Sequence, residues 1–190
     1  MTALNRRSRL PTVAAAVGAA LARHQIRAVL TGGACASLHT RGRYLSRDMD
    51  FILIGTTTQL RLDDALASVG FVRVRDRYVH PDVPFYVEFP RGPLAIGDDY
   101  RIRPLVRRYG RGRWLLLSAT DSCRDRLAAF YHWNDHQSLR VAVEIALAQR
   151  VNLRVIRQWS AAEGFPDRLE EFLGEVRRRR RRGPLLRAGR

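Results

Sequence analysis

A glycine pair, Gly32-Gly33, stands between two short apolar segments, and this order leaves little choice of local fold. Ala28-Val29-Leu30 has the composition of a short strand that ends at Thr31. The glycines permit a close approach of backbone, and residues 34 to about 40 are predicted to continue as a helix. Because exposed amides at a helix start attract anions, this turn is a candidate phosphate site that includes Thr31.

Two aspartates, Asp48 and Asp50, follow the predicted helix and precede the apolar segment Phe51-Ile52-Leu53-Ile54. That segment is typical of a buried strand. Side chains at positions i and i+2 of a strand point to the same face, so the two carboxylates are expected to leave the sheet together. Magnesium prefers carboxylate oxygens and commonly takes substrate phosphates as further ligands. The sequence therefore predicts a Mg²⁺ (or Mn²⁺) site at Asp48 and Asp50.

Each half of this pattern also has a plain structural interpretation. A bare Gly-Gly is typical of a turn, and Asp-x-Asp is typical of a solvated turn or a helix cap. Their order, with an apolar strand after the acids, favours a phosphate and metal site. Arg43 and Arg47 lie between the two halves, where a forked guanidinium suits a triphosphate, although a solvated arginine in a loop is an equal interpretation of each.

The segment from Thr31 to Leu53 resembles the nucleotidyltransferase-fold superfamily, whose signature is a glycine pair, a short helix and Asp-x-Asp on the next strand. Within that superfamily it is most similar to the AbiEii and MenT type of toxin nucleotidyltransferases and to uncharacterised bacterial relatives. The resemblance implies that Gly32 and Gly33 hold nucleotide phosphates and that Asp48 and Asp50 bind magnesium.

The same superfamily adds a third carboxylate from a later strand. Residues 84–90, Pro-Phe-Tyr-Val-Glu-Phe-Pro, form a predicted strand bounded by prolines with one acid in it. The resemblance makes Glu88 the candidate general base or third metal ligand. Without it, Glu88 would be interpreted as the outward residue of an edge strand.

A second stretch supports the toxin branch. Its members resemble one another in a helix of the form Asp-Lys-Leu-x-Ala-Leu, followed by an arginine and an aspartate, and this chain has Asp125-Arg126-Leu127-Ala128-Ala129-Phe130 and then Asp135. Arg126 replaces the expected lysine. A guanidinium stays charged where a buried lysine can lose its proton, so Arg126 is expected to contact phosphate, with catalysis in question. A surface pair on an amphipathic helix is the alternative for Arg126 and Asp135.

Charge favours a polyanionic partner. All 34 basic residues are arginine and the formal net charge is +16. A GC-rich genome explains the absence of lysine, but the positive field is physically present and attracts polyanions. This favours RNA over a neutral sugar as the acceptor. The run Arg177 to Arg182 is typical of a flexible arm, and such an arm also suits a phosphate backbone.

The remaining pattern predicts an α+β protein with a nucleotidyltransferase fold, in which a small mixed β-sheet is flanked by helices and the C-terminal half is helical. Residues 1–119 would form the catalytic core and residues 120–190 a helical region with an arginine-rich tail. Helices are expected at about 121–133, 136–149, 152–163 and 166–180. No stretch approaches the length needed to cross a bilayer, so we expect a soluble, cytoplasmic protein with no membrane partner.

Together these observations predict a magnesium-dependent nucleotidyltransferase that moves a nucleoside monophosphate from an NTP to a hydroxyl. The resemblance implies the 3′ end of tRNA as acceptor, a toxin or defence role, and a cognate antitoxin as partner. Two alternatives stay open. One is a nucleotidyltransferase that modifies a small molecule such as an antibiotic, and the other is a non-catalytic relative that binds nucleotide or RNA.

Overall fold

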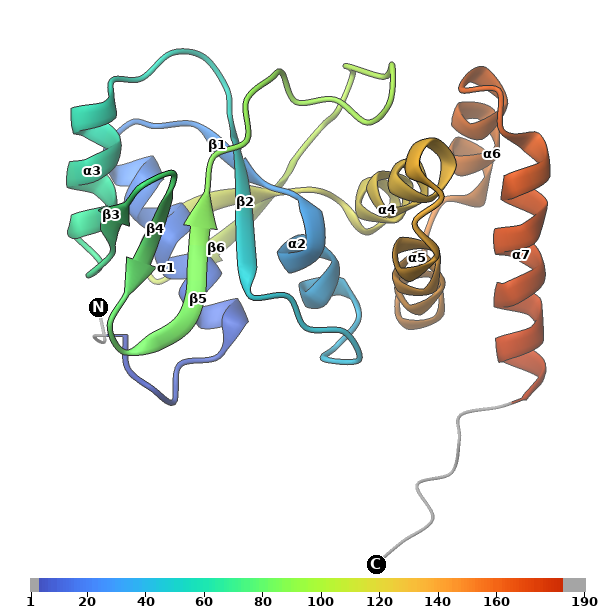
Figure 1. The fold of residues 1–190 in the computed structure, drawn as a ribbon, viewed down its shortest axis with the longest axis horizontal. Coiled ribbons are helices and arrows are strands. Elements are labelled where there is room, and N and C mark those ends of the chain that lie inside the picture. Colours follow the sequence, from blue (N-terminus) through green and yellow to red (C-terminus); the bar gives the residue numbers. More distant parts are fainter. Residues whose placement is uncertain (1–3, 183–190) are drawn as a thin grey trace, which may run out of the picture.

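The computed structural model describes residues 4–182, which fold as a mixed β-sheet with helices on one side and a helical C-terminal half beside it (Figure 1). The helices are α1 (Leu10–Arg23), α2 (Gly32–His39), α3 (Gln59–Ala67), α4 (Ala119–Trp133), α5 (His136–Ala148), α6 (Leu153–Ala162) and α7 (Pro166–Arg181). The strands are β1 (Ala28–Leu30), β2 (Asp48–Leu53), β3 (Val72–Val74), β4 (Arg77–His80), β5 (Val83–Glu88), β6 (Leu105–Tyr109) and β7 (Gly112–Leu116). No helix among these is long and apolar enough to cross a membrane.

The seven strands lie in the order β3-β4-β5-β2-β1-β7-β6. β2 runs parallel to β5, and β1 runs parallel to β7, while β1 and β2 are antiparallel. The two ends of the sheet are the antiparallel hairpins β3–β4 and β6–β7. Helix α2 begins where β1 ends. The glycine turn therefore follows a central strand, which has β2 and β7 as its neighbours.

The two faces of the sheet differ in burial. On β2, Met49 and Phe51 are fully buried, whereas Asp48 and Asp50 between them are only partly buried. Phe51 is paired with Leu30 of β1 in the strand register, so one face of the sheet carries the apolar core. We call the opposite face, which carries Asp48 and Asp50, the carboxylate face.

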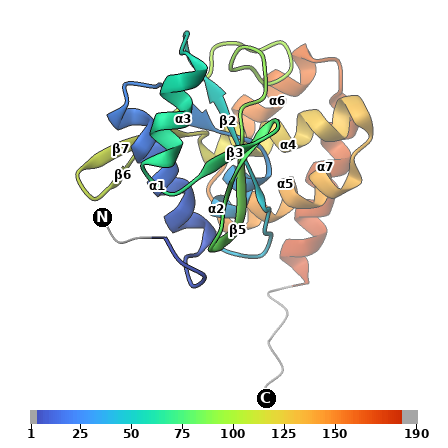
Figure 2. The ribbon, with the colours of Figure 1, turned by 60° about the vertical axis from the view of Figure 1, so that its left-hand side comes forward.

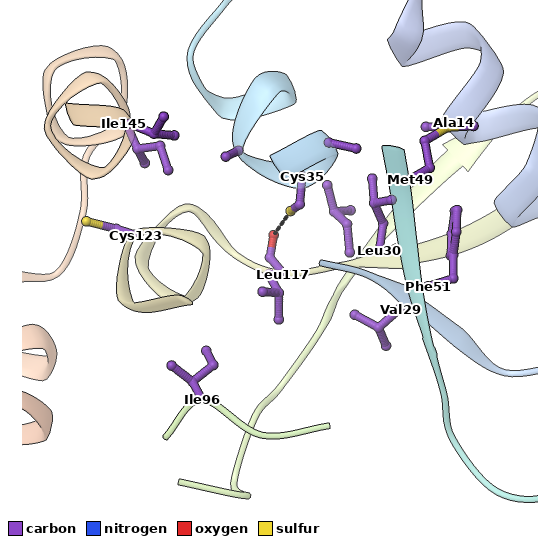
Figure 3. Close-up of a cluster of buried hydrophobic side chains, with 14 of the residues drawn as sticks. Ala14, Val29, Leu30, Cys35, Met49, Phe51, Ile96, Leu117, Cys123 and Ile145 are labelled. Carbon is purple, nitrogen blue, oxygen red and sulfur yellow. Dashed lines mark hydrogen bonds between the residues drawn. The ribbon is translucent and has the colours of Figure 1, made fainter. Parts of the chain in front are cut away.

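Helix α1 covers the core face, and a glycine allows its close approach. Gly18 of α1 lies against Trp114 of β7, and a Cβ at this position would lie 2.8 Å from the Trp114 Cβ. Ala14, one turn earlier, packs near Met49 of β2 (Figure 3). The many alanines of α1 thus serve to bring this helix close to the sheet.

The C-terminal helices form the right-hand part of the molecule in Figure 1, with α4 packed between α2 and α5. The connector from β5 to β6 is attached to them by buried polar contacts. Arg124 of α4, which is nearly fully buried, pairs with Asp99 at 2.6 Å, and the Trp159 indole of α6 donates a hydrogen bond to the Ile96 carbonyl oxygen. Asp99 is therefore a structural partner of Arg124, as its turn setting suggests.

The α+β class, the mixed sheet and the helical C-terminal half are confirmed. The sheet is larger than predicted, because β6 was missed: its two adjacent arginines hide the strand pattern. The prediction of a flexible arm from Arg177 onward is wrong within the described residues. α7 continues through Arg181, and Arg177 and Arg178 pair with Glu170 and Glu175 of the same helix. The last eight residues, 183–190, lie outside the described part of the chain.

The end of β7 is joined to α2 by two side chains. The Leu117 carbonyl oxygen lies 3.0 Å from His39 Nε2 and 3.7 Å from Cys35 Sγ, and Figure 3 shows the thiol directed at this oxygen. Because a carbonyl only accepts, Nε2 of His39 must carry the hydrogen. Burial lowers the pKa of His39, nearby Arg107 lowers it further, and the hydrogen bond opposes them.

This buried histidine predicts a loss of stability in mild acid. With the folded pKa below the ordinary value of about 6.5, the neutral ring favours the folded state. Its contribution is complete above that value and is lost as the pH falls below it. We expect the free energy of unfolding, measured in urea, to fall from pH 7.5 to pH 5.5 more in the wild type than in His39→Gln. An equal fall in both proteins would contradict this role.

Candidate functional site

Three carboxylates lie side by side on the carboxylate face. β2 and β5 are paired in parallel so that Asp50 is opposite Glu88 and Asp48 is opposite Tyr86. Residues paired in this way share a face, so Asp48, Asp50 and Glu88 leave the sheet together. The same-face placement of the two aspartates is as the strand pattern predicts, and Glu88 joins them from the neighbouring strand.

The electrostatics of this cluster are unfavourable when it is empty of cations. Burial, together with the negative charges of Asp48 and Glu88, raises the pKa of Asp50 to about 6. Arg126 acts in the opposite sense. Since like charges at short range disfavour ionisation, the arrangement attracts positive charge to Asp50.

The glycine turn touches this cluster directly. Gly32 has a φ of +61°, and a Cβ there would overlap the carboxylate of Asp50. The turn is fixed to β2 by the Thr31 amide, which donates to the Asp50 carbonyl oxygen at 2.9 Å. Gly32 thus meets two requirements at once, a left-handed backbone and the absence of a side chain. The first amides of α2 consequently lie beside the carboxylates.

A series of hydroxyl contacts fixes the orientation of Asp48. Ser46 donates from its hydroxyl to Asp48, and its amide donates to the hydroxyl of Ser37 at 2.9 Å. Ser37 in turn donates to the Gly33 carbonyl oxygen at 3.0 Å. A Cβ on Gly33 would lie 2.6 Å from Ser46 Oγ. A side chain at position 33 would therefore clash with Ser46. Because Ser37 of α2 holds Ser46, and Ser46 holds Asp48, the orientation of Asp48 depends on α2.

Arg126 reaches the cluster from α4. Its guanidinium pairs with Asp125 at 2.8 Å, and only a fifth of the side chain is exposed. Burial lowers the pKa of Arg126, but the charge and hydrogen bonds of Asp125 and the charge of Asp50 outweigh it and raise the pKa. Arg126 is thus a permanent positive charge held near Asp50 by a neighbouring carboxylate.

Asp135 has a clear structural role as the N-cap of α5. Its carboxylate accepts hydrogen bonds from the amides of Gln137 and Ser138 at 2.9 and 3.1 Å, and from the Ser138 hydroxyl at 2.7 Å. Burial alone would raise the pKa of Asp135, but these bonds and the charge of Arg126 lower it. Asp135 therefore positions α5 next to Arg126, and capping explains its place in the sequence without a ligand.

The two loop arginines differ. Arg47 directly precedes β2 and is exposed, and among residues 4–182 it forms no ion pair. Arg43 lies 3.4 Å from Glu144 of α5, so it connects the loop with the C-terminal helices. Of the two, Arg47 is the one available to an incoming anion.

A ready metal cage is absent from the described part of the chain. No group of three or more His, Cys, Asp or Glu side chains there is drawn together closely enough to hold an ion. The carboxylate pair Asp48 and Asp50 still has the oxygen donors that magnesium prefers, and such ions are often held by one or two carboxylates together with substrate phosphates. A hollow of about 480 Å³ lies elsewhere, lined by residues of α3, β3 and β4.

Several residues of the site were missed in the sequence. Ser37 and Ser46 orient Asp48, and Tyr44 and Asp125 surround Arg126. The spacing Ser46-x-Asp48 places both side chains on one side of an extended segment, which is the only local signal. The contacts of Ser37 and Asp125 depend on the packing of α2 and α4 on the sheet, which no local pattern reports.

The contact between Gly32 and Asp50 predicts a specific energetic coupling. Gly32→Ala is expected to destabilise the protein through backbone strain of about 1 kcal/mol and through overlap with the carboxylate. Gly42→Ala is the matched control, because Gly42 also has a positive φ but has no neighbour within 4 Å. Gly32→Ala should cost more than Gly42→Ala in denaturant unfolding, and the excess should disappear in an Asp50→Ala background. Additive effects of the two substitutions would contradict the contact.

Comparison with known proteins gives no further guide to this site. No family model matches the chain, and neither the curated proteins nor the solved structures contain a significant match. The chemistry of the site is therefore inferred from its carboxylates, glycines and arginines.

Proposed function

We propose that this protein is a magnesium-dependent nucleotidyltransferase that moves a nucleoside monophosphate from an NTP to a hydroxyl group. One observation carries this proposal. The parallel register of β2 and β5 sets Asp50 beside Glu88, with Asp48 on the same face and Gly32 against the Asp50 carboxylate. The carboxylates offer oxygen ligands to a cation, and the neighbouring amides at the start of α2 offer hydrogen bonds to an anion. A metal-bound triphosphate requires both at one point.

The carboxylates and the glycine turn have separate roles in the proposed reaction. Asp48 and Asp50 would hold Mg²⁺, which supplies charge stabilisation for the phosphate oxygens during in-line displacement. The first amides of α2, at Gly32 and Gly33, bind phosphate oxygens of the NTP. Glu88 accepts a hydrogen bond from the acceptor hydroxyl and takes its proton as the new bond to the α-phosphorus forms, while the bond from the α-phosphorus to the β-phosphate oxygen breaks and pyrophosphate leaves.

Arg126 serves as a fixed positive charge in this scheme. Its partner Asp125 and its burial restrict its motion, and a guanidinium does not release its proton near neutral pH. It therefore stabilises phosphate charge and is not a proton carrier. The exposed guanidinium of Arg47, just before β2, would contact the outer phosphates of the NTP.

RNA is the acceptor that the charge favours. The net charge of +16 raises the local concentration of polyanions near the protein. We propose the 3′ end of tRNA as the acceptor hydroxyl, in line with the resemblance of the glycine and aspartate motif to toxin nucleotidyltransferases. A small-molecule acceptor is the alternative, and it would gain nothing from this charge.

The activity is tested by incubating the protein with each α-labelled NTP, Mg²⁺ and total tRNA. We expect label on tRNA with the wild type and a loss of at least a thousandfold in Asp48→Asn, Asp50→Asn, since both metal ligands are gone. Asp82→Asn, Asp167→Asn is the matched control, because both carboxylates are exposed and lie just before β5 and in the first turn of α7, away from Glu88 at the end of β5. In a parallel assay with aminoglycosides or lincosamides, label on these compounds and none on tRNA would show that the acceptor is a small molecule. Label transferred by Asp48→Asn, Asp50→Asn would overturn the site.

Metal binding is tested separately through stability. In EDTA at pH 8 we expect Asp50→Asn to be more stable than the wild type by about 1 to 2 kcal/mol after allowance for solvent screening. The folded pKa of Asp50 is raised, so its ionised form disfavours folding, and the gain should shrink as the pH falls through 6 toward 4. Added Mg²⁺ should raise the melting temperature of the wild type alone. A response of Asp50→Asn equal to that of the wild type would exclude this metal site.

A further inference from the structure

The β6–β7 hairpin carries an unusual concentration of positive charge. Residues 100–120 contain six arginines and no acidic residue. All six are exposed: Arg101, Arg103, Arg107, Arg108, Arg111 and Arg113. Within the described residues only Arg101 pairs with a carboxylate, that of Asp99 at 3.4 Å. The other five are positive charges without an ionic partner.

The hairpin also places two of these charges directly across from each other. Arg108 of β6 and Arg113 of β7 are partners in the antiparallel register. Like charges at such positions repel and destabilise the strand pair. β6 is the last strand of the sheet, so one side of its backbone is unpaired, and Val106 beside it is 59% exposed. An anion with repeated charges would relieve this repulsion.

The strand register shows that this pair lies on the carboxylate face. Val29 is paired with Leu115 of β7 and with Ile52 of β2, so Leu115 and Ile52 share a face. Counting two residues along each strand gives Arg113 on β7 and Asp50 on β2. Arg108, opposite Arg113, belongs to the same face. The arginine pair and the three carboxylates therefore look out from one side of the sheet.

The separation suits a bound polymer. Strands are spaced about 4.8 Å apart and rise about 3.3 Å per residue. From the register, Arg113 is two strands and about four residues from Asp50, which corresponds to roughly 16 Å. At about 3.4 Å per nucleotide along one strand, roughly five nucleotides of a nucleic acid strand span this distance. Figure 2 shows the hairpin projecting at one side of the molecule.

The other arginine-rich segment is different in kind. On α7, Arg177 and Arg178 pair with Glu170 and Glu175, and Arg179 pairs with Glu144 of α5. These charges are already partly compensated by the protein. Half of the arginines from Arg177 to Arg182 thus have a carboxylate partner, whereas within the described residues none of the four arginines of the hairpin has one.

We propose that the β6–β7 hairpin binds the phosphate backbone of RNA through Arg108 and Arg113 and directs the strand toward the carboxylates. This inference rests on the proposed function for the direction of the strand, but the binding itself requires no catalysis. The arginine pair fixes phosphates by charge and forked hydrogen bonds. The exposed edge around Val106 contributes apolar contact to sugars and bases. The surface thus holds the acceptor, and the carboxylates hold the nucleotide.

The test is a binding titration of a labelled single-stranded RNA between 50 and 300 mM salt, without NTP. Arg108→Gln, Arg113→Gln should weaken binding about tenfold at 100 mM salt and lower the slope of log affinity against log salt by about 1.4, for two lost phosphate contacts. Arg177→Gln, Arg178→Gln is the matched control, because it removes the same net charge from α7. We expect the control to remain within about twofold of the wild type.

The outcomes separate this surface from the catalytic proposal. Equal weakening by both variants would show that only net charge matters and would overturn the hairpin site, as would an absence of RNA binding by the wild type. Repeating the titration in the Asp48→Asn, Asp50→Asn background keeps the readout independent of catalysis. Hairpin-dependent binding without transfer to RNA would support the surface and refute the proposed reaction. Transfer to RNA, together with RNA binding that the hairpin substitutions leave unchanged, would support the proposed reaction and refute the hairpin surface.

Discussion

The parallel pairing of β2 with β5 is the constraint on which the site depends. It sets Asp50 beside Glu88, although 38 residues separate them, and alternation along β2 adds Asp48 on the same face. Burial of Met49 and Phe51 on the opposite face fixes this register, because a slip by one residue would move the aspartates into the core. Packing of apolar side chains thus determines where three negative charges meet.

α2 connects this pairing with the rest of the molecule. Its first residue, Gly32, touches Asp50, and Ser37 one turn later helps to orient Asp48 through Ser46. At its other end, His39 is bonded to the end of β7. A short helix therefore links the carboxylates with the strand that carries the arginine hairpin. A disturbance of α2 would alter the glycine turn, the aspartates and the hairpin together.

Local pattern was sufficient for part of this arrangement. The i, i+2 spacing on a predicted strand indicated the shared face of Asp48 and Asp50, whereas Glu88 was proposed through the resemblance, since its strand alone suggested an outward edge residue. The sequence could not show that β5 lies next to β2, since strand order depends on how helices pack on the sheet. Asp135 was expected to contact nucleotide only through the resemblance, and its role as the N-cap of α5 was not anticipated. The β6 strand was hidden because its arginines replace the expected apolar residues.

The two ends of the sheet differ in how they avoid contact with other chains. Edge strands expose unpaired backbone groups and can join to another sheet. β3 has only three residues, which limits any such pairing, although Val72 and Val74 are exposed there. β6 is longer, and its arginines repel a second copy of itself. Charge at this edge therefore opposes self-association through β6, and a bound polyanion that neutralises these arginines would remove that protection.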